Sequence, residues 1–101
     1  MSIVKALINK ESIRNQSMIA EYEKELKELP KGVLRLKRIG KQDYYYLYYR
    51  DGKKVISKYV GKDIETVDQL KDLLMKREHI ETMLKVLKQE QEQIKKMEAL
   101  I

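Results

Sequence analysis

The sequence predicts an α+β fold in which a three-stranded antiparallel sheet is flanked by two long helices. Charged residues make up 38% of the chain beside 43% apolar residues, a balance typical of long amphipathic helices. Pro30 and Gly32 end one helical pattern, Gly61 precedes another, and the stretch between them is rich in strand-forming tyrosines. We expect a single domain, 1–101, built from a helical arm (1–30), a basic Tyr-rich sheet (31–62) and a long amphipathic helix (63–101).

The N-terminal arm carries apolar residues at helical spacing. Its clearest stripe is Ile19, Tyr22, Leu26 and Leu29, with charged residues on the other faces. Pro30 disfavours helical geometry at Leu29 and so ends the pattern there. An upstream apolar stripe from Ile3 to Ile8 has a different phase, so residues 3–29 form either one helix or two.

The middle of the chain predicts strands and tight turns. Leu34 and Leu36 alternate with basic residues, Gly40 to Asp43 predicts a turn, and Tyr44 to Arg50 is a run of strong strand formers. Asp51-Gly52 is a hairpin signal. With a two-residue loop, one face holds Tyr44, Tyr46, Tyr48, Val55, Ser57 and Tyr59, and the other holds Tyr45, Leu47, Tyr49, Lys54, Ile56 and Lys58. One face must pack on a helix, and the more cationic face is the better candidate for ligand contact.

The C-terminal helix is predicted to be unusually long. Asp63 and Thr66 compete as its N-cap, and Thr66 with Gln69 fits the capping-box pattern. A helix from 66 to 101 would be roughly 54 Å long, more than a small sheet can cover. Its heptad seam consists of Ile80, Met83, Leu87, Ile94, Met97 and Ile101. Either the first helix folded back antiparallel or a second copy of the chain must bury the far end, and we expect a homodimer through this coiled-coil seam.

Positive charge is concentrated in one segment. Residues 31–62 hold ten Lys and Arg, six of the seven tyrosines and two acids, a net charge of +8. Phe and Trp are absent, which implies that many Tyr hydroxyls meet water or a hydrogen-bond partner. We predict that this segment binds nucleic acid, DNA more than RNA. Phosphates would be neutralised by Arg35, Lys37, Arg38, Lys41, Lys54 and Lys58, and bases stacked or positioned by Tyr45 and Tyr49.

Several functions lack support in the sequence. There is no cysteine, and His79 is the only histidine, so we expect neither a metal site nor any cofactor. Because no Ser/His/Asp constellation or glycine-rich phosphate loop is present, we expect no enzymatic activity. No apolar run approaches the roughly 20 residues that cross a bilayer, and no signal-peptide pattern opens the chain. We therefore expect a cytoplasmic protein that does not bind membranes.

Three stretches of the chain form a recognisable core: Leu29-Pro30-Lys31-Gly32, then Tyr44-Tyr45-Tyr46-Leu47-Tyr48-Tyr49-Arg50-Asp51-Gly52-Lys53, then Ser57-Lys58-Tyr59-Val60-Gly61-Lys62. This core resembles a family of small uncharacterised prokaryotic proteins encoded on phages and other mobile elements. The hairpin is also similar to one that opens some insertion-sequence transposases and to three-stranded DNA-binding modules of integrases. The resemblance covers about a third of the chain, carries no catalytic signature and implies a mobile-element setting, where small basic proteins bind DNA or disable host defence nucleases.

Two other functions stay open at this point. In the first, the chain is a phage-type inhibitor that binds a host nucleic-acid-processing protein, such as a CRISPR nuclease, through the same surface or through the helical arms. In the second, it is a scaffold in which the coiled coil is the function and the charge serves solubility. Charge reversal at Lys37, Lys54 and Lys58 would leave every interaction of such a scaffold intact.

Overall fold

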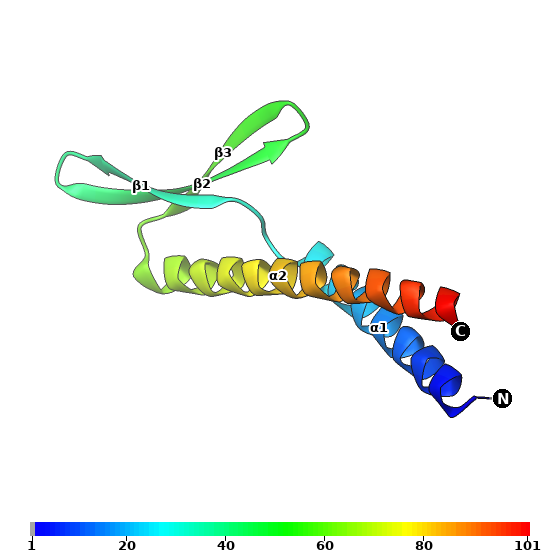
Figure 1. Ribbon diagram of the computed structural model, residues 1–101. Coiled ribbons are helices and arrows are strands. Elements are labelled where there is room, and N and C mark those ends of the chain that lie inside the picture. The colour runs from blue at the N-terminus through cyan, green and yellow to red at the C-terminus, as the bar shows by residue number, and fades with distance from the viewer. Residues whose placement is uncertain (1) are drawn as a thin grey trace. The chain divides into compact units, whose positions relative to one another are not determined.

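The computed structural model describes residues 2–101 and has the predicted α+β fold (Figure 1). The elements follow the order α1 (Ile3–Glu28), β1 (Val33–Ile39), β2 (Gln42–Asp51), β3 (Lys54–Gly61) and α2 (Ile64–Leu100). They form two compact units. The helical unit comprises residues 2–28 and His79–Ile101, and the basic unit comprises Leu29–Glu78, so that α2 contributes to both. Whether the two units unfold together as the predicted single domain is a separate question, and the single domain stays a prediction.

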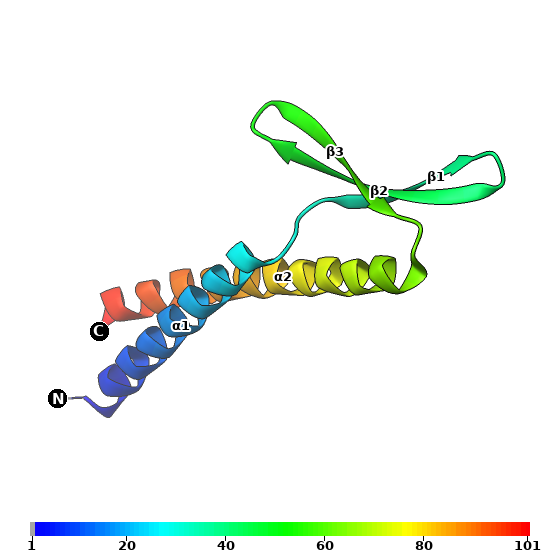
Figure 2. The ribbon, with the colours of Figure 1, turned by 180° about the vertical axis from the view of Figure 1, so that it is seen from behind.

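In the helical unit, α1 and the second half of α2 run in opposite directions and cross (Figure 2). The alternative of two N-terminal helices is wrong, because α1 is one continuous helix of 26 residues. Its stripe of buried and half-buried side chains, spaced by three and four residues, is Ile8, Ser12, Asn15, Ile19, Tyr22 and Leu26. Asn15 Nδ2 donates a hydrogen bond of 2.9 Å to the Leu87 carbonyl oxygen of α2. Lys88 and Glu23 form an ion pair at 3.2 Å across the same contact.

The predicted heptad seam of α2 is only partly available to another chain. Ile80 and Leu87 are buried, at 1% and 5% exposure, and Met83 and Ile94 are half-buried. Leu84, which lies outside the predicted seam, is also buried. The contact with α1 accounts for this burial, so the intramolecular alternative holds for this part of the helix. The last two seam residues, Met97 and Ile101, are about half exposed.

The basic unit contains the sheet and the first half of α2. The strand order is β1-β2-β3, and both pairings are antiparallel. Only Tyr45 to Tyr48 of β2 pairs with strands on both sides. Beyond this centre the sheet continues as two two-stranded ribbons, which extend in opposite directions along β2 (Figure 1).

Each ribbon ends in a two-residue turn of glycine followed by lysine. Gly40-Lys41 joins Ile39 to its partner Gln42, and Gly52-Lys53 joins Asp51 to its partner Lys54. Both glycines have positive φ, +66° and +63°, whereas no other residue type in the described chain does. A positive φ at the first turn position followed by a negative one fits a type II′ turn, whose twist matches that of the strands. The predicted turn at Gly40–Asp43 is therefore shorter than expected, because Gln42 and Asp43 already pair in β2.

Asp63 is the N-cap of α2. One carboxylate oxygen accepts the Glu65 backbone N–H at 3.3 Å, and the other accepts the Thr66 hydroxyl at 2.8 Å. The Asp63 carbonyl accepts the first helical hydrogen bond, from the Val67 N–H at 3.0 Å. The competing capping box at Thr66 is wrong, because the Thr66 hydroxyl donates to Asp63 and Thr66 already lies inside the helix. Among residues 2–101, no helix is both long and apolar enough to span a membrane.

Candidate nucleic-acid interface

The strand register divides the side chains of the sheet between two faces. Tyr46 pairs with both Arg35 and Tyr59, and Leu47 pairs with both Leu34 and Lys58. We call the face that carries Tyr46 the open face. Its residues are Val33, Arg35, Lys37, Ile39, Gln42, Tyr44, Tyr46, Tyr48, Arg50, Val55, Ser57 and Tyr59. The helix-side face holds Leu34, Leu36, Arg38, Asp43, Tyr45, Leu47, Tyr49, Asp51, Lys54, Ile56 and Lys58. The two sequence-predicted faces of the second hairpin are confirmed by this register.

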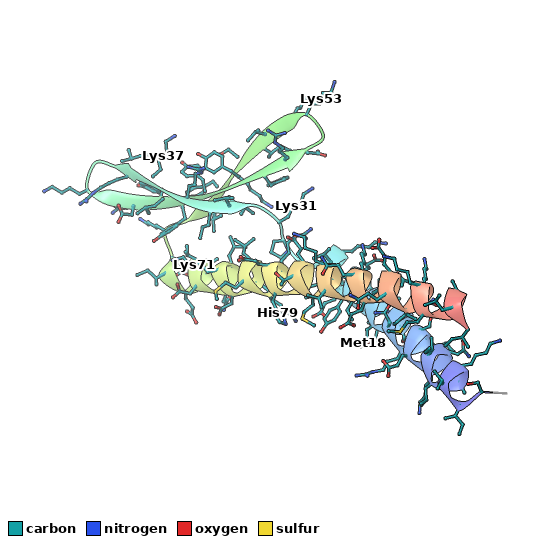
Figure 3. All side chains as sticks on the ribbon, in the orientation of Figure 1. Met18, Lys31, Lys37, Lys53, Lys71 and His79 are labelled. Carbon is teal, nitrogen blue, oxygen red and sulfur yellow. The ribbon has the colours of Figure 1, made fainter. Side chains whose placement is uncertain are left out.

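The helix-side face packs on the first half of α2. Leu47 is 7% exposed, and Val67 on α2 is 2% exposed. Lys71, one helical turn after Val67, places its Nζ 5.6 Å from the ring centroid of Tyr45. Arg77 of α2 also donates a hydrogen bond of 3.0 Å to the Leu29 carbonyl, just before the sheet. The open face is therefore the one turned away from α2, as Lys37 shows in Figure 3.

On the open face, cations lie over tyrosine rings. The Arg35 guanidinium carbon is 5.9 Å from the centroid of the Tyr48 ring, and Lys37 Nζ is 5.6 Å from that of Tyr46. The register partners of Arg35 and Lys37 on β2 are Tyr46 and Tyr44. Each cation therefore lies over the ring two residues further along β2, its diagonal neighbour. Cation–π attraction of about 0.5–1 kcal/mol at such exposed sites favours these positions.

The remaining rings of this face contact one another. Tyr59 lies 5.4 Å from Tyr46 and 6.2 Å from Tyr44, centroid to centroid, with tilted planes. Tilted arrangements at these distances are favourable for aromatic pairs. The open face is consequently a layer of tyrosine rings with a guanidinium and an ammonium group held on it. This arrangement can present positive charge to an anion, because both cations lie on the solvent-facing side of the ring layer.

The net charge of the two units differs sharply. The basic unit holds thirteen Lys and Arg against seven Asp and Glu, a formal net charge of +6, whereas the helical unit holds nine of each. Within the strands and turns of the sheet, the only acids are Asp43 and Asp51. Asp43 lies 3.8 Å from Arg38, and both side chains are at least half exposed, so water screens this pair. The sheet therefore carries the charge surplus of the chain.

The structure does not bring all the sequence-predicted binding residues together. Arg35 and Lys37 lie on the open face, and Lys41 lies at a ribbon turn. The others, all on the helix-side face, are Arg38, Tyr45, Tyr49, Lys54 and Lys58. Tyr45 and Tyr49, the predicted stacking residues, are half-buried there. The open-face residues that the sequence prediction missed are the exposed Arg50 and Tyr59 and the half-buried Tyr44, Tyr46 and Tyr48.

Slightly more aliphatic residues lie on the helix-side face than on the open face. Leu34, Leu36, Leu47 and Ile56 fall on the helix-side face, whereas Val33, Ile39 and Val55 fall on the open face. The register that pairs Leu34 with Leu47 also places Tyr45 and Tyr49 on the helix-side face. Aliphatic side chains favour the packed face of a half-buried sheet, since they have no polar group to satisfy. Counting cations alone did not separate the faces, because lysines lie on both.

His79 lies on α2 in the helical unit and is exposed. Across the described residues, no group of three or more His, Asp or Glu side chains is placed to hold a metal ion.

Residues 8–71 of the chain match the family DUF6788, described as a domain of unknown function. The match includes all of the sheet, the turns and the Asp63 cap, together with most of α1 and the start of α2. No curated protein and no solved structure matches the chain.

Proposed function

We propose that this chain, which belongs to the DUF6788 family, is a non-enzymatic nucleic-acid-binding protein that contacts duplex DNA with the open face of its sheet. The observation that carries the proposal is the placement of Arg35 and Lys37 over the Tyr48 and Tyr46 rings on the face turned away from α2. Cations held in this way are ready to meet phosphates without first losing much side-chain freedom.

The charge distribution supports phosphate as the ligand group. A formal charge of +6 on the basic unit, with none on the helical unit, attracts a polyanion to the sheet. Lys and Arg side chains that neutralise phosphates release condensed counterions, and this release drives binding. Because lysine predominates over arginine in residues 31–62, backbone contact is favoured over base-edge recognition, which uses bidentate arginines.

The occupied ring faces favour a duplex over a single strand. A base can stack only on an uncovered ring, yet Tyr46 already has Lys37 and Tyr59 against it and Tyr48 has Arg35. A two-stranded ribbon fits the major groove of B-DNA, about 12 Å wide, and both ribbons here end in exposed turns. The deep, narrow major groove of A-form RNA excludes side chains, which favours DNA over RNA.

The biological setting is part of the proposal. We propose a role in a phage or other mobile element, on the sole ground of the resemblance drawn from the sequence between the Tyr-rich hairpin and those of insertion-sequence transposases and integrase DNA-binding modules. The matched family is described only as a domain of unknown function. The open face supports the binding part of such a role, and no catalytic part is proposed.

A salt titration with matched charge variants tests this function. Binding of duplex DNA, single-stranded DNA and RNA would be measured for the wild type, for Arg35→Glu/Lys37→Glu and for Lys24→Glu/Lys85→Glu. The last pair makes the same charge change on exposed residues of the helical unit. We expect duplex DNA to bind best, with affinity falling steeply as salt rises. Reversal of Arg35 and Lys37 should weaken binding about 100-fold and reduce the salt slope by about 2.

The control pair should shift duplex affinity by only a few-fold, through the change in overall charge. Equal losses in the two double variants would show that the attraction is a general property of a basic chain and not of the open face. Flat salt dependence, or retention of an acidic host protein after all nucleic acid is digested, would instead support the inhibitor function.

A further inference from the structure

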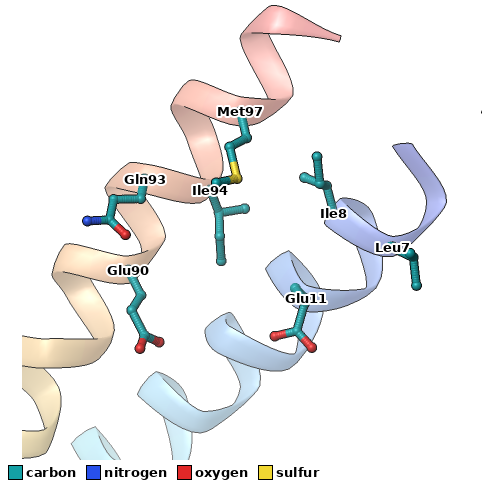
Figure 4. A pocket seen from close by; sticks show the side chains of 7 residues that line it. All are labelled: Leu7, Ile8, Glu11, Glu90, Gln93, Ile94 and Met97. Atoms are coloured by element: carbon teal, nitrogen blue, oxygen red, sulfur yellow. The ribbon is translucent and has the colours of Figure 1, made fainter. Parts of the chain in front are cut away.

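The helical unit has an apolar groove at its open end. The first turns of α1 and the last turns of α2 diverge, and a groove of about 400 Å³ lies between them. Figure 4 shows Ile8, Ile94 and Met97 directed into this space, with Glu11 and Glu90 at one side. Ile8 also lines a second, adjoining hollow with Ile101 and Glu98. The intramolecular contact that buries Ile80 and Leu87 is looser at this end, where Ile8 and Ile94 are only half-buried.

The apolar surface continues beyond the groove. Its exposed members, from 49% to 86% exposed, are Ile3, Val4, Leu7, Met97, Leu100 and Ile101. Single exposed apolar residues are ordinary, but six gathered at one end of a helix pair form a surface of the kind that binds another protein. Val4 also extends the packed stripe of α1 by one turn, and Ile101 extends that of α2, so the same packing pattern can continue against further helices.

The charge of the helical unit favours a second copy of the chain over a polyanion as the occupant of the groove. The α1 segment of this unit holds five bases and five acids, and the α2 segment holds four of each. Two copies that meet through these surfaces therefore meet without net repulsion, whereas two basic units would each bring +6. The charged residues that line the groove and the adjoining hollow are three acids, Glu11, Glu90 and Glu98, and one base, Lys5. A nucleic acid or an anionic membrane has no charge to recognise here.

We propose that the diverging ends of α1 and α2 form a homodimer interface in which a second copy of the chain covers the groove. The interface is isologous, since the same apolar groove and mixed charges serve on both sides. It is independent of the proposed DNA binding and differs from the predicted seam, whose first half is buried within the chain.

Sedimentation equilibrium without nucleic acid, over about 1–100 μM, tests the interface. We expect a mass twice the chain mass of 12.1 kDa for the wild type. Leu7→Glu/Leu100→Glu should be monomeric at the same concentrations, with dimer affinity reduced at least about 100-fold. The matched control, Ile64→Glu/Met75→Glu, changes two comparably exposed apolar residues of the basic unit and should remain dimeric. A monomeric wild type at 100 μM, or a dimeric Leu7→Glu/Leu100→Glu variant, would overturn the proposal.

A crosslinking measurement covers the case in which the double variant fails to fold. The chain has no cysteine, so a single introduced thiol is a clean reporter. Leu100→Cys should form a disulfide-linked dimer under mild oxidation, whereas Met75→Cys should not. Equal crosslinking at both positions would indicate random collision and contradict the interface. Loss of DNA binding in the open-face variants would not affect either measurement.

Discussion

The two units of this chain differ in how they are held together. The helical unit buries the aliphatic residues Ile80, Leu84 and Leu87 between two crossing helices and has no net charge. The basic unit buries only Leu47 and Val67 among its apolar residues and leaves one face of its sheet in water. Its order depends more on backbone pairing and on the positions of its glycines. We therefore expect the basic unit to be broken most easily through its backbone and the helical unit through its side chains.

Gly32→Ala should have the largest effect. Gly32 has φ +130°, and a Cβ placed there would lie 2.5 Å from the Tyr48 carbonyl oxygen and 3.0 Å from Leu47 Cδ1. The backbone of β2 would have to shift to admit a methyl group, and an L-residue is strained at this φ in any case. We expect a loss of about 3–5 kcal/mol in the free energy of unfolding of the basic unit. Urea denaturation followed by tyrosine fluorescence measures it, since six of the seven tyrosines lie in this unit.

Gly40→Ala is the matched control for this prediction. Gly40 also has positive φ, at +66°, but nothing lies within 4 Å of the position of an added Cβ. Only the conformational cost remains, about 1–2 kcal/mol. Equal losses of stability in the two variants would show that close packing against β2 is not the reason for a glycine at position 32.

Ile80→Ala should have the next largest effect, and it acts on the other unit. The side chain is 1% exposed, so truncation leaves a cavity between α1 and α2 and costs about 2–5 kcal/mol. We expect the helical signal in far-UV circular dichroism to melt earlier while the tyrosine transition moves much less. Leu47→Ala, at 7% exposure in the basic unit, should do the reverse. Coincident shifts of both signals would show one cooperative domain, as the sequence analysis predicted, and would contradict independent units.

Most of the fold could be predicted from the sequence because its signals are local. Pro30 and the four dispersed glycines mark the boundaries between elements, and strict alternation fixes which strand residues share a face. The choice of which face packs on α2 is not local, since it depends on contacts with Val67 and Lys71, well over ten residues away from the strand centre. For that reason the predicted stacking pair, Tyr45 and Tyr49, falls on the packed side.

The helix seam shows the same limit. Residues with heptad spacing on a long helix are equally suited to a partner within the chain and to a second copy. At the centre of the helical unit the partner of α2 is α1, as the hydrogen bond from Asn15 to the Leu87 carbonyl shows. A search for apolar residues at helical spacing does not find this contact, because Asn15 is polar. Ser12 and Asn15 are the buried residues of α1, yet neither belongs to the apolar stripes from which packing was predicted.

Asp63→Ala should have the smallest effect of the three stability predictions, and it tests where α2 begins. Losing the carboxylate removes the acceptors of the Glu65 N–H and the Thr66 hydroxyl, and we expect a cost of about 1 kcal/mol in the basic unit. Asp63→Asn retains an acceptor oxygen and should recover most of that loss in urea denaturation. Thr66→Ala is the discriminating variant, because a cap at Thr66 would make it the more damaging change. In the observed arrangement the Thr66 hydroxyl only donates to an exposed carboxylate, so its removal should cost less than removal of Asp63.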